Sequence, residues 1–181
     1  GKTTFSLAGI NLTDSNILQV RVEDAAGNAG KEISKAYFLD TSGPITTVES
    51  FAFSADTGAS STDFITRTAA QTITGTLSAE LVSGEVVKVS LDNGKTWQTA
   101  TSTVGQKTFS LSGVTLKGNN TLQVRVEDAA GNVGVAKTQG YTLDTSAPGT
   151  TVSTIAFSDD TGTSSSDLDR KSTSELQSRE T

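Results

Sequence analysis

A ten-residue segment, Gln-Val-Arg-Val-Glu-Asp-Ala-Ala-Gly-Asn, occurs twice in the chain, at residues 19–28 and 123–132. The two copies are separated by 123 − 19 = 104 residues. The same offset relates five further pairs of identical residues: Phe5 and Phe109, Asp40 and Asp144, Asp56 and Asp160, Gly58 and Gly162, and Asp63 and Asp167. A repeat of this length and similarity indicates tandem copies of one domain, and not a short solenoid unit.

The repeat register divides the chain into one complete unit and parts of two others. Residues 45–148 make the whole unit, residues 1–44 match only the C-terminal half of a unit, and residues 149–167 match only the start of a third. Residues 168–181 depart from the repeat, and their polar, charged sequence predicts a disordered tail. A period of about 100 residues suits an all-β sandwich. One full hydrophobic core is therefore expected.

Composition argues against several kinds of partner and site. The chain carries 14 Lys and Arg against 20 Asp and Glu, a net charge of −6. Nucleic acid and anionic membrane surfaces bind clustered cations, so neither is an expected partner. Cys and His are absent, which rules out a disulfide, a thiol nucleophile, an imidazole base and a His-ligated zinc site. No apolar run approaches the roughly 20 residues that span a bilayer, so no membrane insertion is expected in this segment.

Short runs of alternating apolar and polar residues, separated by turn residues, predict an all-β unit. The dipeptide Asn93-Gly94 predicts a two-residue hairpin turn, since both central residues of such a turn need positive φ. The predicted strands are residues 47–54, 71–78, 86–92, 95–101, 107–111, 121–127 and 133–143.

The same alternation predicts which residues form the core, because successive side chains of a strand point to opposite faces. The residues predicted to face inward are Ile73, Leu77, Val87, Val89, Leu91, Phe109, Leu111, Leu122, Val124, Val126, Tyr141 and Leu143. Trp97 is the only tryptophan and is expected to contribute most to the core, because burying its ring removes about 150–250 Å² from water. Its replacement by Ala is then expected to cost about 3–5 kcal/mol.

Residues 90–97, Ser-Leu-Asp-Asn-Gly-Lys-Thr-Trp, fit the pattern S-x-D-x-G-x-T-W and resemble the Asp-box hairpin of sialidase-type propellers. In that motif the Ser and Asp side chains bond the turn backbone and the Trp packs beneath it. A propeller needs several blades, whereas this match is single in the unit. The box is also structural, and not catalytic, in the family it resembles. A glycosidase is therefore not expected.

Two loops place oxygen atoms where a cation could bind. The loop 128–132, Asp-Ala-Ala-Gly-Asn, recurs at 24–28. Asp128 either hydrogen-bonds its own turn or, with the Asn132 carbonyl oxygen, ligates Ca²⁺, a hard cation that prefers oxygen ligands. The polar loop 56–63, recurring at 160–167, sets two carboxylates seven residues apart around a glycine, so both can fold back onto one ion.

A third motif, Leu-Asp-Thr-Ser-Ala-Pro at 143–148, is matched at 39–44 and follows a predicted strand in each copy. Its proline ends sheet pairing and stiffens the connection to the next unit.

Together these motifs resemble the bacterial Ig-like tandem repeats of giant type I-secreted adhesins and biofilm-associated surface proteins of Gram-negative bacteria. The matching features are the D-x-A-G-N loop, the L-D-T-x-x-P joint and the D-T-G-x-S-x-x-D loop, which together span residues 1–167. The resemblance implies an Ig-like antiparallel Greek-key β-sandwich in tandem repeat. It also implies type I secretion to the bacterial cell surface and Ca²⁺ near the domain joints.

In such a sandwich the last hairpin lies where the chain enters and the first inter-strand loop lies where it leaves. Asp56, Asp63 and Asp144 are then expected at one joint, facing the hairpin of the next unit. At the preceding joint the 128–132 loop is expected to face Asp40. The candidate Ca²⁺ ligands are Asp40, Asp56, Asp63, Asp128, Asn132 and Asp144.

The sequence bears on three classes of function. The preferred one is a structural spacer of a surface adhesin that supports cell adhesion and biofilm formation, with neighbouring repeats as partners and host or abiotic surfaces bound through other domains. The alternative is a module that recognises carbohydrate or a host surface protein. It predicts exposed aromatics, whereas Trp97, Tyr37 and Tyr141 lie in strand patterns. The third, a hydrolase, lacks His, Cys and an evident acid pair in a cleft, so no enzyme is expected.

Overall fold

The computed structural model describes residues 3–158 and residue 164. The chain divides between residues 145 and 146 into two units. The predicted disordered tail at 168–181 lies outside the described residues, as do Asp160 and Asp167. The repeat boundaries at residues 44, 148 and 167 remain predictions. We call residues 45–148 the complete repeat and residues 1–44 the half-repeat.

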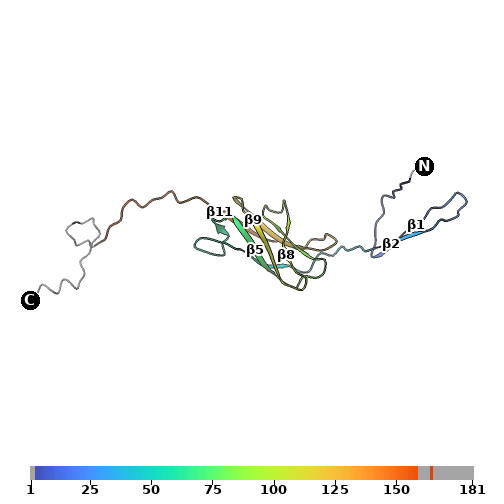
Figure 1. Ribbon diagram of the computed structural model, residues 1–181, viewed down its shortest axis with the longest axis horizontal. Helices are drawn as coiled ribbons and strands as arrows, with labels where there is room; N and C mark the ends of the chain where they lie inside the picture. The colour runs from blue at the N-terminus through green and yellow to red at the C-terminus, as the bar shows by residue number, and fades with distance from the viewer. Residues whose placement is uncertain (1–2, 159–163, 165–181) are drawn as a thin grey trace, which may run out of the picture. The chain divides into compact units, whose positions relative to one another are not determined.

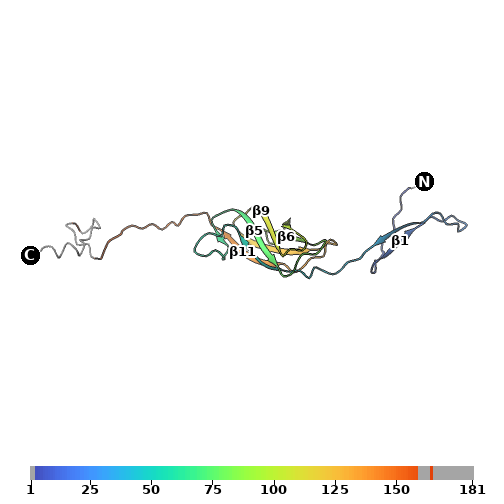
Figure 2. The same cartoon turned by 60° about the horizontal axis from the view of Figure 1, so that its bottom comes forward.

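The complete repeat is an antiparallel β-sandwich, which confirms the all-β fold predicted from the sequence (Figures 1 and 2). One sheet has the strand order β3-β5-β9-β8 and the other β4-β11-β10-β6-β7, and only the β4–β11 pairing is parallel. The pairing of strands distant in sequence, as in β5–β9 and β6–β10, is the Greek-key connectivity of Ig-like sandwiches. The strands are β3 (Val48–Phe53), β4 (Ile65–Thr66), β5 (Ala70–Leu77), β6 (Val86–Ser90), β7 (Gln98–Thr99), β8 (Thr101–Ser102), β9 (Thr108–Thr115), β10 (Asn119–Glu127) and β11 (Lys137–Leu143).

One hydrophobic core lies between the two sheets and contains residues of both. In β10 the buried residues Leu122, Val124 and Val126 alternate with partly buried ones, as the sequence pattern predicts. Leu91, Leu111 and Leu143 are only partly buried and pack against this core. The buried apolar residues that alternation did not identify are Val48, Phe53, Phe64, Leu81, Ala100, Val114 and Leu116.

Trp97 is not part of this core, so the prediction that it anchors the sandwich is wrong. The ring is partly buried, and the guanidinium of Arg125 lies over it, 3.8 Å from the ring centroid. Arg125 alternates along β10 with Val124 and Val126, whose side chains face the core. The indole therefore packs on the outer face of the sheet, where its N–H group can reach a polar partner.

The predicted hairpin around Asn93-Gly94 is also corrected. Both residues have positive φ, 60° and 80°, as expected. However, β6 ends at Ser90 and β7 covers only Gln98–Thr99, so the connection is a seven-residue loop and not a two-residue turn. The backbone N–H groups of Gly94 and Thr96 donate to the side-chain oxygens of Ser90 and Asp92, and these bonds replace the strand ladder predicted for 95–101. That range instead contributes β7 to one sheet and β8 to the other.

The last strand begins later than the sequence predicts, because β11 starts at Lys137 and not at Val133. Val133 makes only an isolated bridge with Glu127.

In residues 3–44, the described part of the half-repeat, β1 (Asn16–Val20) and β2 (Ile33–Tyr37) form one antiparallel pair. Its register joins Asn16 to Tyr37 and Val20 to Ile33. Adding the repeat offset of 104 gives Asn120 with Tyr141 and Val124 with Lys137, which is the β10–β11 register of the complete repeat. The repeated sequence therefore forms the same hairpin twice.

Candidate functional site

The Asp-box loop is held by its own side chains. Ser90 is buried, and its Oγ accepts a hydrogen bond from the Gly94 N–H group at 2.8 Å and donates one to Asp92 Oδ1 at 2.8 Å. The Asp92 carboxylate also accepts hydrogen bonds from the Thr96 N–H group at 2.8 Å and from the Thr96 hydroxyl at 2.6 Å. These bonds give the motif the structural role predicted from its resemblance.

The same bonds make the stability of the loop depend on pH. Hydrogen bonds from the Thr96 side chain and backbone, followed by that from Ser90, lower the pKa of Asp92 from 3.8 to about 2. Because the folded-state pKa lies below the unfolded value, this carboxylate contributes stability above about pH 4 and loses that contribution as pH falls toward 2.

We therefore expect Asp92→Asn to flatten the loss of stability between about pH 4 and pH 2. Urea unfolding of both proteins over this range measures the slope. Parallel slopes for the variant and the wild type would show that the hydrogen-bonded carboxylate does not contribute.

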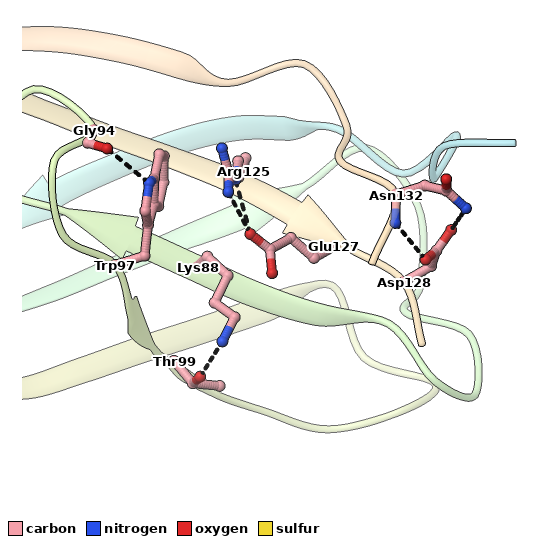
Figure 3. A network of polar contacts seen from close by, with 8 residues as sticks. All are labelled: Lys88, Gly94, Trp97, Thr99, Arg125, Glu127, Asp128 and Asn132. Atoms are coloured by element: carbon pink, nitrogen blue, oxygen red, sulfur yellow. Dashed lines mark hydrogen bonds and ion pairs between the residues drawn. The ribbon is translucent and has the colours of Figure 1, made fainter. Parts of the chain in front are cut away.

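Trp97 belongs to a polar stack on the outer face of the sheet (Figure 3). Its Nε1–H group donates to the Gly94 carbonyl oxygen at 3.0 Å. Arg125, which covers the ring, donates from Nε and Nη2 to Glu127 Oε1 at 2.9 and 2.6 Å. Alternation along β10 places the Arg125 side chain on the outer face of the sheet. Its contact with the Trp97 indole, which lies in the loop after the neighbouring strand β6, could not be predicted from the sequence.

Because the ring lies outside the core, we expect Trp97→Ala to cost about 1–2 kcal/mol, less than the 3–5 kcal/mol expected from the sequence. The loss comes from partial burial and the cation–π contact with Arg125. Trp97→Phe keeps a ring under the guanidinium and is the matched control. Denaturant unfolding measures both, and a loss near 4 kcal/mol for Trp97→Ala would contradict the surface placement.

At the β10–β11 hairpin, the Asp128 carboxylate bonds its own turn. Oδ1 accepts hydrogen bonds from the Ala130 and Asn132 N–H groups, each at 2.9 Å, and Oδ2 accepts one from the Asn132 side-chain amide at 2.9 Å. The Asn132 side chain is the main cause of a lowered pKa of Asp128. The Asn132 carbonyl oxygen in turn accepts the Asp128 N–H group at 3.1 Å. Asp24 and Asn28 repeat this arrangement in the half-repeat.

The structure also brings Asp40 to this hairpin. The Asn132 side-chain amide donates to the Asp40 backbone oxygen at 3.1 Å, while Asp40 Oδ1 accepts the Ser42 N–H group at 3.0 Å. The contact between the two residues therefore runs through a backbone carbonyl of Asp40 and not through its carboxylate.

The 56–63 loop folds back so that both of its aspartates hold the following backbone. Asp56 Oδ2 accepts the Phe64 N–H group at 3.0 Å, and Asp63 Oδ1 accepts the Ile65 N–H group at 3.0 Å. Asp56 Oδ1 is buried and accepts no hydrogen bond. Phe64 takes positive φ, 62°, where the loop turns into β4.

Asp144 lies where the chain leaves the sandwich. Its N–H group donates to the Thr66 carbonyl oxygen at 2.9 Å, beside the 56–63 loop. An open pocket at this end is lined by Thr57, Gly58, Ile65, Thr66, Arg67 and Asp144.

A buried glutamine, which sequence reasoning missed, fixes the start of this loop. The side chain of Gln71 accepts hydrogen bonds from Ser54 and the Ala55 N–H group, and donates to the carbonyl oxygens of Ala55 and Thr68. Its position in the alternating pattern of β5 predicts an inward side chain, but two of its three partner residues, Ser54 and Ala55, are 17 and 16 residues away in sequence.

The six candidate ligands therefore fall into two groups at opposite ends of the complete repeat. Among residues 3–158 and 164, no three acidic side chains come close enough together to hold a metal ion. One observation is consistent with a bound cation. Asp56 Oδ1 is buried without a hydrogen-bond partner, and leaving a buried polar atom unpaired costs folding free energy. A hard cation such as Ca²⁺ would suit this carboxylate oxygen.

Comparison with known proteins shows the family. No helix in the described part of the chain is long and apolar enough to cross a membrane. No curated protein matches the chain in sequence. Residues 43–145, more than half of the chain, match the family model of the bacterial Ig-like domain. With its two-sheet Greek-key sandwich and its repeat, this chain belongs to the bacterial Ig-like domain family.

Proposed function

We propose that this chain is a structural spacer of a bacterial surface adhesin, in which tandem Ig-like repeats extend the molecule from the cell and support adhesion and biofilm formation. Domains of this family commonly occur in surface and extracellular proteins and are typically not enzymes. The observation that carries the proposal is the 104-residue repeat of one sandwich sequence. A tandem array of similar domains provides length and a regular series of joints.

The ends of the complete repeat suit such an array. The chain enters beside the β10–β11 hairpin, where a side chain at Gly43 would meet the Val133 carbonyl oxygen at 3.0 Å. It leaves at the other end of β11, where Leu143 pairs with Thr66. Entry and exit at opposite ends let successive units follow one another in a line.

We further propose that Ca²⁺ stiffens these joints. The support is the unpartnered buried Asp56 oxygen and the two groups of ligand candidates at the ends of the sandwich. A next unit would bring its own Asp-Ala-Ala-Gly-Asn hairpin toward Asp56, Asp63 and Asp144. Such a hairpin adds oxygen atoms to an end where the described residues alone hold too few carboxylates.

Calcium is therefore expected to raise the melting temperature of a protein with two whole repeats. A ligand that binds only the folded state at a hundredfold excess over its Kd adds about 2.7 kcal/mol. Extracellular Ca²⁺ modules bind at about 0.1–1 mM, so thermal unfolding is compared in EDTA and in about 10 mM CaCl₂.

Asp56→Asn and Asp144→Asn are expected to reduce the rise in melting temperature that Ca²⁺ causes. Asp92→Asn, in the Asp-box loop, is the control and is expected to leave this rise unchanged. Small-angle scattering of the same samples measures the length of the array. Equal melting temperatures and equal scattering lengths in both buffers would leave these aspartates as turn formers only.

The position of Trp97 favours a second candidate function, a module that binds carbohydrate. The ring lies on an outer sheet face, partly buried, and is not part of the core. A residue that stacks on a sugar must lie on such an outer face. Arg125 already covers one face of it. Binding to a glycan array that is lost in Trp97→Ala but kept in Asp56→Asn would support this function over the spacer.

A further inference from the structure

The dipeptide Asn93-Gly94 has a chemical reactivity that the function does not use. Asn93 is the one asparagine of the chain that is followed by glycine. In such a pair the glycine nitrogen can attack the asparagine side chain, because glycine carries no side chain to hinder the approach. Asn93 is also exposed, so water can reach it. This pair is therefore the site in the sequence most open to deamidation.

Deamidation would proceed through a cyclic imide. The Gly94 nitrogen loses its proton and bonds to the Asn93 side-chain carbonyl carbon, Cγ. The bond from Cγ to Nδ2 breaks, and Nδ2 takes up a proton and leaves as ammonia. Water then adds to one of the two imide carbonyl carbons and opens the ring. One opening gives aspartate, and the other gives isoaspartate, in which the main chain runs through the former side chain.

In the folded loop the attacking nitrogen is not free. The Gly94 N–H group donates to Ser90 Oγ at 2.8 Å, and Ser90 is buried at the end of β6. The Gly94 carbonyl oxygen accepts the Trp97 Nε1–H group at 3.0 Å (Figure 3). These two bonds hold Gly94 on both sides, and the first also keeps the proton on the nitrogen that would have to lose it.

The asparagine is held as well. Asn93 Oδ1 accepts a hydrogen bond from Gln123 Nε2 of β10 at 3.0 Å, and the Asn93 N–H group donates to the Thr121 carbonyl oxygen at 3.0 Å. Asn93 and Gly94 both have positive φ, 60° and 80°. Closing the imide ring requires rotation about the Cα–C and Cα–Cβ bonds of Asn93, so the loop must first give up these contacts.

We propose that Asn93 is a deamidation site that the Asp-box loop protects, and that aspartate and isoaspartate form there only when residues 91–97 open locally. This inference is independent of the spacer function, of Ca²⁺ and of carbohydrate binding. Isoaspartate adds one carbon atom to the main chain between Asp92 and Gly94. The spacing that brings the Gly94 N–H group to Ser90 is then lost, so an opened and converted loop does not close again.

The test follows conversion of Asn93 in the full chain at mildly alkaline pH, with and without urea. Trypsin releases residues 89–95, in which Asn93 is the sole asparagine, and mass spectrometry detects the change from amide to carboxylate. A sample taken at zero time corrects for conversion during digestion. The folded chain is expected to convert at least about tenfold more slowly than the unfolded chain. Equal rates in the two states would overturn the inference.

Two variants with the same substitution sharpen the test. Ser90→Ala removes the acceptor of the Gly94 N–H group and is expected to raise the rate in the folded chain at least about threefold. Ser110→Ala changes a partly buried serine of β9, in the other sheet, and is expected to leave the rate unchanged. Urea unfolding checks that both variants are folded. Equal rates in the two folded variants would contradict the protection by Ser90.

Gln123→Ala covers the case in which Ser90→Ala does not fold. It removes the donor to Asn93 Oδ1 and keeps the bond between Ser90 and Gly94. The freed Asn93 side chain is expected to convert at least about twofold faster than in Ser110→Ala. A rate equal to that of Ser110→Ala would show that the contact with β10 does not protect Asn93, and would overturn the inference.

Discussion

Replacing Phe109 by Ala is expected to lower the free energy of unfolding of the complete repeat by about 3–5 kcal/mol. The ring is 3 % exposed and lies between the two sheets as part of the core. Its removal takes away the burial energy of an aromatic side chain and leaves a cavity that a sandwich of paired strands closes only in part. Urea unfolding followed by circular dichroism measures the change.

The repeat supplies a control within the same chain. Phe5 stands at the counterpart position, in a similar local sequence, but is 79 % exposed. Phe5→Ala is therefore expected to change the free energy of unfolding of the complete repeat by less than about 0.5 kcal/mol. Similar losses for both substitutions would mean that Phe5 is covered as Phe109 is, and would contradict the structure of the half-repeat.

Replacing Gly75 by Ala is expected to cost about 3 kcal/mol, a large loss for one added methyl group. Gly75 lies opposite Phe109 in the β5–β9 ladder, and a Cβ at this residue would overlap both the Phe109 ring and the Ser50 backbone oxygen. The ring could shift, but the Ser50 oxygen belongs to strand β3 and moves only with its strand. The expected loss therefore comes from displacement of β3 as well as from crowding in the core.

Gly140→Ala is the matched control for this substitution. Gly140 is also in a strand and lacks positive φ, but a Cβ there would meet no atom within 4 Å. It is expected to leave stability unchanged or to raise it by about 0.4–1 kcal/mol, since Ala reduces the freedom of the unfolded chain. Thermal unfolding of the two variants compares them directly, and equal melting temperatures would show that the space beside Gly75 is not closed.

The strands that carry a regular pattern were predictable from the sequence. In β10, Leu122, Val124 and Val126 alternate with Arg125 and other polar residues, and the alternation of side chains along a strand fixes which of them face the core. The Asp-box loop was also predictable in its hydrogen bonds, because Ser90 and Asp92 bond backbone groups only two to four residues away. Local contacts of this kind follow from local sequence.

The candidate site was predictable in part. The sequence placed Asp56, Asp63 and Asp128 in loops, and each carboxylate bonds the backbone of its own loop. It did not predict that Asp40 meets Asn132 through a backbone oxygen, or that Gln71 holds the start of the 56–63 loop. Both contacts join residues that only the folded sandwich brings together.

Trp97 shows where the pattern fails. The side chains of Ser90 and Asp92 take the 91–97 segment out of the strand ladder, so counting alternate residues across it no longer tells which sheet face the indole meets. Phe64 was not predicted as a core residue for a related reason. It has positive φ and lies outside the regular strands, so strand alternation does not indicate that its ring packs inward against Phe53.

The repeated ten residues give the sharpest contrast between sequence and tertiary structure. The sequence determined the β1–β2 hairpin and the β10–β11 hairpin alike, with one register and one Asp-Ala-Ala-Gly-Asn turn, because these depend on hydrogen bonds within the hairpin. It did not determine burial. Val22 is exposed and Val126 is buried, although each lies in the same ten residues. Burial was decided by the tertiary structure, because only Val126 has the strands of residues 45–104 packed against it.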